Sequence, residues 1–70
     1  MCLAIPARIE SVRGDRGTVE LYGSRRDVLL ALVPGAKVGD WVLIHAGMAI
    51  TTVTEDEARE TFDVLQGKAP

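Results

Sequence analysis

Residues 41–53, WVLIHAGMAITTV, carry the pattern that decides the fold. Two short apolar runs, residues 41–46 and 48–53, lie on either side of Gly47, and each has the length of an ordinary β-strand. The glycine predicts a bend or a bulge between them. The segment is therefore typical of two consecutive strands in a small β-protein.

The residues upstream repeat this arrangement of short apolar segments and turn signals. Residues 5–12 and 18–22 predict two further strands, and 18–22 alternates apolar and polar side chains cleanly. Residues 27–33 end in an unbroken apolar run, which predicts a third strand buried on both faces. Turn residues separate these segments at 14–17, 23–24 and 34–35.

The C-terminal part changes from strand to helix periodicity. Thr54 and Glu57 form a capping-box pattern, which predicts that a helix begins there and runs over residues 54–66. Its apolar spacing is expected to lay Phe62 and Leu65 against the rest of the molecule.

Length and composition fit one domain built from these elements. Seventy residues with a single cysteine can form no internal disulfide, so apolar packing must hold the fold, and 47% of the residues are hydrophobic. We predict a mainly β fold, a small OB-like β-barrel of about five strands followed by one C-terminal α-helix. The single domain spans residues 1–70, with the barrel in 1–53, the helix in 54–66 and a short tail in 67–70.

Charge and hydropathy argue against several partners. Residues 1–54 carry a net charge of +1 and residues 55–63 a net charge of −4, so no basic stripe is available for nucleic acid. No segment approaches the length of apolar sequence that spans a bilayer, and no targeting segment is visible. A lone thiol suits a reducing compartment, and we expect a cytoplasmic protein.

Cys2 is the residue whose side chain could carry the most chemistry. It precedes the first predicted strand, where a side chain is expected to be accessible. Removal of Met1 would place its thiol beside a free α-amine, and a nearby ammonium favours the thiolate. A thiolate can hold a soft metal or attack an electrophile, although an incidental cysteine is the simpler interpretation.

His45 is the only histidine. By alternation it shares a face with Trp41 and Leu43, opposite Val42 and Ile44. It could be a strand-end histidine hydrogen-bonded to nearby backbone. It could also lie across the barrel mouth from Cys2 as a second metal ligand or proton partner. A thiol enzyme that uses both residues is a third hypothesis, but no orienting residue is evident. A plain OB-like interaction module is a fourth.

Two motifs extend this picture through a resemblance. The opening MCLAIP, residues 1–6, and the segment GDWVLIHAG, residues 39–47, closely resemble the two signatures of the HypC/HybG/HupF family of [NiFe]-hydrogenase maturation chaperones. The resemblance extends to about residue 66. Met48 stands where many members have an aromatic residue.

The resemblance implies a non-enzymatic carrier with an OB-like barrel. Such proteins lose the initiator Met, pair with the maturation protein HypD, and carry a transient iron that bears cyanide and carbon monoxide ligands. They then bind the precursor of the hydrogenase large subunit. Carried onto this chain, Cys2 and His45 are expected to contact the iron. The expected partner-binding residues are Cys2, Leu3, Ile5, Pro6, His45, Gly47 and Met48. The iron is expected to be stable only in the complex with HypD.

Overall fold

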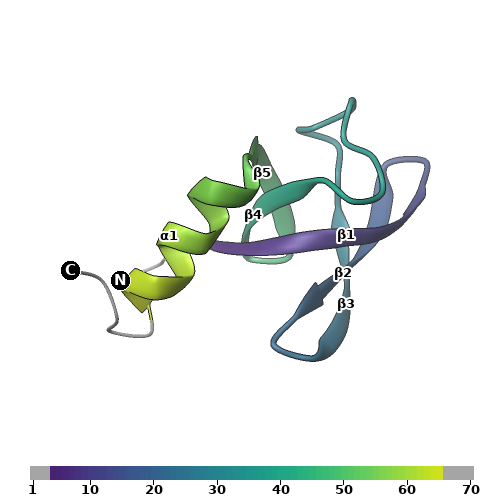
Figure 1. Ribbon diagram of the computed structural model, residues 1–70. Coiled ribbons are helices and arrows are strands. Elements are labelled where there is room, and N and C mark those ends of the chain that lie inside the picture. Colours follow the sequence, from purple (N-terminus) through teal and green to yellow (C-terminus); the bar gives the residue numbers. More distant parts are fainter. Residues whose placement is uncertain (1–3, 66–70) are drawn as a thin grey trace.

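The protein folds as a five-stranded barrel with a helix packed on its side (Figure 1). The structure is a computed structural model that describes the backbone of residues 4–65 and the side chains of residues 4–61. The elements in chain order are β1 (Ile5–Arg13), β2 (Arg16–Leu21), β3 (Ser24–Leu29), β4 (Trp41–His45), β5 (Met48–Val53) and α1 (Glu55–Leu65). The predicted fold class is confirmed.

The strands close in the order β1-β2-β3-β5-β4. The long strand β1 pairs with two neighbours. Its first half pairs with β4 and its second half with β2, both antiparallel. Closure between β3 and β5 rests on one parallel pair, Leu29 with Met48. The Leu29 N–H also donates to the Gly47 carbonyl oxygen at 3.0 Å. The seam between β3 and β5 is thus the least paired part of the barrel.

Inward-facing residues from all five strands fill the barrel. Ala7, Ile9, Val19 and Val42 are buried, as the alternation of their segments predicts. The remaining buried hydrophobic residues of this core are Val28, Leu30, Val33 and Ala49. Apolar packing therefore runs through the whole barrel.

Gly17 marks the tightest crossing in this core. A Cβ at Gly17 would lie 2.7 Å from the Ser11 carbonyl oxygen and 2.7 Å from Leu30 Cδ1. The facing strand β1 shifts register between Ile9 and Ser11, as at a β-bulge. Only glycine allows the two strands and Leu30 to approach this closely.

The third strand differs from its prediction. We expected a strand over 27–33 buried on both faces, but β3 ends at Leu29, which pairs with Arg16, the first residue of its antiparallel partner β2. The chain then turns, and the Val33 N–H donates to the Leu30 carbonyl oxygen at 3.0 Å. Leu30 and Val33 are buried while Leu32 is 59% exposed. The apolar run 28–33 has the composition of a strand, but beyond Leu29 it has no neighbouring strand to pair with, so it forms a turn instead.

The helix begins as predicted. The Thr54 N–H donates to Glu57 Oε1 at 2.9 Å, and the Glu57 N–H donates to Thr54 Oγ1 at 3.1 Å. This reciprocal pair satisfies two N-terminal donors of α1. The helix lies against β1 and β4 with Ala58 buried. The side chains of Phe62 and Leu65 lie outside the described part. Within residues 4–65, no helix has the length and apolar content needed to cross a bilayer.

Candidate functional site

The start of β1 and the turn between β4 and β5 lie at the same end of the barrel (Figure 1). Ile5 pairs with Ile44 in antiparallel register, so the next residue of β4, His45, lies where the chain enters β1. His45 in turn pairs with Met48 across the turn. The register thus brings together Ile5, His45, Gly47 and Met48, four of the residues predicted from the sequence.

Two residues make the β4–β5 turn. Ala46 has φ +55° and Gly47 has φ +78°, so both adopt left-handed backbone. Two such residues in succession are the geometry of a type I′ hairpin turn, whose twist matches that of the flanking strands. The predicted bend at Gly47 is therefore a tight hairpin. The bulge lies beyond it, because Leu43 pairs with Thr51 and Ile44 with Ala49.

Ala46 is the site residue that the sequence interpretation missed. An alanine in left-handed backbone costs about 1–2 kcal/mol, since its Cβ approaches the following carbonyl oxygen. Such a cost beside a candidate ligand is typical of functional sites. The dipeptide Ala46-Gly47 between two apolar runs was the signal that could have predicted the two-residue turn.

His45 projects from this turn into solvent. Its side chain is exposed, whereas Val42 on the opposite face is fully buried and Ile44 packs against the core. Within the described residues, no side chain or backbone group hydrogen-bonds to the imidazole. The alternative of a strand-end histidine bonded to backbone thus has no support there, and no described carboxylate bonds to the imidazole as the orienting residue of a thiol enzyme would.

Pro6 lies beside this turn and is buried. It pairs with Leu43 of β4, while β1 pairs with β2 only from Arg8 onward. A proline favours an edge strand, and β1 meets this condition only locally, because the strand as a whole lies between β4 and β2. The missing N–H of Pro6 is tolerated where β1 has one neighbour.

The two N-terminal candidates, Cys2 and Leu3, lie outside the described residues. Among residues 4–65, no group of three or more His, Cys, Asp or Glu side chains could hold a metal ion. The described part of the candidate site therefore contributes His45 alone as a metal donor.

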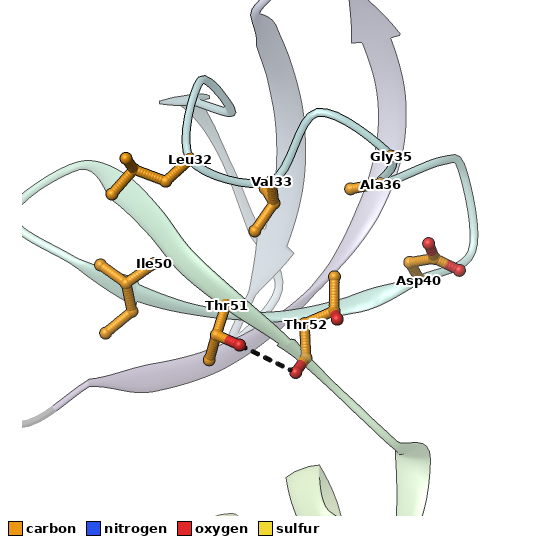
Figure 2. Close-up of a pocket in the computed structure, with 8 residues that line it drawn as sticks. All are labelled: Leu32, Val33, Gly35, Ala36, Asp40, Ile50, Thr51 and Thr52. Carbon is orange, nitrogen blue, oxygen red and sulfur yellow. Dashed lines mark hydrogen bonds between the residues drawn. The ribbon is translucent and has the colours of Figure 1, made fainter.

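A surface depression lies elsewhere on the barrel. It has a volume of about 450 Å³ and lies between β5 and the loop that follows β3 (Figure 2). Its one ionisable residue is Asp40, whose carboxylate accepts from the Lys37 backbone N–H at 3.1 Å and from Lys37 Nζ at 3.3 Å. The backbone bond above all keeps the pKa of Asp40 below its ordinary value. A lone carboxylate occupied by its own loop offers no catalytic pair.

A family model matches both the start of β1 and the β4–β5 turn. The HupF/HypC family model covers residues 1–65 of this chain. The chain belongs to the HupF/HypC family.

Curated relatives agree with this assignment. The chain is 40% identical over 72 aligned residues to the hydrogenase maturation factor HypC of Escherichia coli K12, covering 94% of this chain and 80% of the relative. It is 47% identical over 63 residues to HypC of Cupriavidus necator, covering 89% of this chain and 70% of that relative. It is 38% identical over 73 residues to the maturation factor HybG of E. coli K12, covering 94% and 89%. The family resemblance stated from the two motifs is confirmed.

Proposed function

We propose that this protein is a hydrogenase maturation chaperone. With HypD it carries an iron that bears cyanide and carbon monoxide, and it delivers this cargo to the [NiFe]-hydrogenase large-subunit precursor in the cytoplasm. The observation that carries the proposal is the family match over residues 1–65, which includes Cys2 and the exposed His45. The protein performs no turnover of its own.

The register of β1 supports a shared role for Cys2 and His45. Ile5 follows Cys2 by three positions, so their Cα atoms lie at most roughly 11 Å apart, given about 3.6 Å per extended residue. Ile5 pairs directly with Ile44, the neighbour of His45. The Cα atoms of such a pair lie about 5 Å apart. The chain before Ile5 is therefore long enough for Cys2 to approach the β4–β5 turn.

The donor chemistry of the two residues suits this cargo. A thiolate is a soft donor, and imidazole also binds iron. With only these two protein donors the iron keeps positions for its own ligands and for a partner's residues. A carrier must release what it holds, so a sparse donor set is an advantage. We expect stable iron only in the complex with HypD.

The test is co-purification of the protein with its partners from the native cytoplasm. Wild type and Cys2→Ala are compared, and the captured proteins are identified by mass spectrometry. We expect wild type to retain HypD and the large-subunit precursor and Cys2→Ala to lose them. Thr51→Ala, an exposed change on β5 away from the turn, is the matched control and should retain both.

Either of two results would overturn the proposal. Wild type could capture neither partner, which would leave a plain interaction module as the function. Cys2→Ala could instead retain both partners as wild type does, which would remove the cysteine from the mechanism.

A further inference from the structure

One edge of β3 is open beside the β4–β5 turn. On one side β3 pairs with β2 at six positions, from Leu21–Ser24 to Arg16–Leu29. On the other side it pairs with β5 only at Leu29. Within residues 4–65, no second strand therefore lies beside β3 between Ser24 and Val28.

Alternation determines which backbone groups face this opening. The Leu29 N–H donates to Gly47 O at 3.0 Å, so it points away from β2. In an antiparallel ladder the N–H and C=O of every second residue point to the same side. The N–H and C=O groups of Arg25 and Asp27 therefore point outward, while those of Arg26 and Val28 face β2. The edge offers two donors and two acceptors in the spacing of a strand.

The side chains along this edge leave positive charge exposed. Arg26 is exposed and forms no ion pair with any described residue. Arg25 contacts Glu10 at 2.7 Å but remains 73% exposed. The one acidic side chain, Asp27, already accepts from Arg13 at 3.3 Å and from Thr18 at 3.0 Å. An acidic segment would complement this edge.

The opening leads directly to the candidate site. Asp27 precedes Leu29 by two residues, which is roughly 7 Å along a strand. Leu29 is the residue bonded to Gly47, so a strand placed beside Arg25 and Asp27 would end at the Ala46-Gly47 turn. The edge and His45 can thus contact one partner together.

We propose that an extended acidic segment of a partner protein pairs with the open edge of β3, adding a strand to the barrel beside the turn that carries His45. Main-chain hydrogen bonds to Arg25 and Asp27 supply the pairing, and the arginines select the acidic sequence. This inference rests on the proposed function only for which protein supplies the segment.

A second copy of this chain fits the edge poorly. Antiparallel self-pairing centred on Arg26 would set two Arg26 side chains directly opposite each other, and like charges in that position are destabilising. The same register sets Arg25 opposite Asp27, but these two side chains already pair with Glu10 and Arg13 of their own chain. Charged residues on an open edge are a common protection against such self-association. The same charges favour an acidic partner.

The direct test measures amide hydrogen exchange in the full chain by NMR. The probes are a blocked hexapeptide of alternating Glu and Val, at millimolar concentration, and its Lys-Val counterpart. We expect the acidic peptide to slow exchange at Arg25 and Asp27 several-fold, with Arg26 and Val28 unchanged because they already bond to β2. The Lys-Val peptide should have no effect. Equal exchange with and without the acidic peptide, or slowing at residues elsewhere, would overturn the proposal.

A matched pair of variants extends the test to the natural partner. Arg25→Ala and Arg25→Pro both remove the side chain, but only proline also removes the outward N–H, and neither affects the bonds to β2. In the co-purification above, Arg25→Pro should capture markedly less partner than Arg25→Ala. Equal capture by both variants would reject the strand pairing while leaving the maturation role intact. Loss of capture in Cys2→Ala alone, with full capture by both Arg25 variants, would likewise reject the strand pairing and leave the maturation role intact. The peptide measurement decides the inference even when no partner is captured.

Discussion

The crossing of β1 and β2 and the turn between β4 and β5 both depend on a glycine, for opposite reasons. At Gly17 a Cβ would meet the Ser11 carbonyl oxygen and Leu30 at 2.7 Å. At Gly47 nothing lies within 4 Å of such a Cβ, and the backbone conformation, φ +78°, is what favours glycine. The first position is fixed by packing and the second by backbone geometry alone.

This difference separates stability from recognition. Around Gly17 the side chains are buried, and each fills space that its neighbours leave. In the β4–β5 turn His45, Ala46 and Gly47 are exposed, so the His45 imidazole and the backbone of the turn are available to a partner. The hairpin geometry fixes the backbone of the turn, while its surface takes no part in core packing.

The largest predicted effect is a difference in unfolding free energy between two isoleucine-to-alanine variants. Ile9 is 1% exposed and Ile50 is 41% exposed. Ile9→Ala should lower the free energy of unfolding by about 2–5 kcal/mol, because it leaves a cavity in the barrel. Ile50→Ala should cost less than about 1 kcal/mol, since Ile50 lies outside the core cluster and a large part of its surface is already hydrated. Urea denaturation followed by circular dichroism gives both values. Similar losses would show that the core does not lie where the barrel places it.

The next effect compares the two glycines directly. Gly17→Ala should destabilise by about 1–3 kcal/mol, because the Ser11 backbone cannot move aside without opening the sheet. Gly47→Ala should cost about 1–2 kcal/mol, the cost of left-handed backbone for an alanine. Gly47→D-Ala in a synthetic chain adds the same methyl group and suits positive φ, so it should restore wild-type stability. A Gly47→D-Ala protein as unstable as Gly47→Ala would contradict the assignment of this cost to φ.

A smaller effect concerns acid and the helix cap. Hydrogen bonding from the Thr54 backbone N–H lowers the pKa of Glu57 below its ordinary value of 4.5. A lowered folded-state pKa adds stability that is present above pH 4.5 and is lost as the pH falls through the folded-state value. Helical circular dichroism and the denaturation midpoint of wild type should therefore decline below about pH 4.5. Glu57→Gln keeps the capping hydrogen bonds without a titrating group and should show a weaker decline. An unchanged acid transition in Glu57→Gln would assign the effect to other carboxylates, such as Asp40.

The smallest stability effect is expected at His45. Its side chain is exposed and hydrogen-bonds to nothing in the described residues, so His45→Ala should change the unfolding free energy by less than about 0.5 kcal/mol. Thermal unfolding beside wild type measures this. A clear loss of stability would make His45 a structural residue.

The sequence predicted the elements whose signals are local. The apolar run at 48–53 and the capping box of Thr54 and Glu57 correspond to observed structure. The alternation in 18–22 lies in β2 up to Leu21, while Tyr22 already belongs to the following turn with φ +51°. The prediction of the third strand was wrong because β3 ends at Leu29, opposite Arg16, the first residue of β2. This limit is set by strand pairing rather than by the composition of 27–33.

The candidate site was predictable only in part, for a similar reason. Two motifs indicated His45 and its neighbours, but the meeting of β1 with the β4–β5 turn depends on the register between Ile5 and Ile44. The open edge of β3 depends on how little of β5 reaches it. Neither property belongs to any single segment of sequence.

The most direct test of the maturation role is the infrared spectrum of the complex co-purified with HypD. The account predicts stretching bands of metal-bound cyanide and carbon monoxide with wild type. It predicts their loss in Cys2→Ala and a shift or loss in His45→Ala, with the bands unchanged in Thr51→Ala. Absence of these bands from the wild-type complex, or unchanged bands in Cys2→Ala, would contradict the claim that this end of the barrel carries the iron.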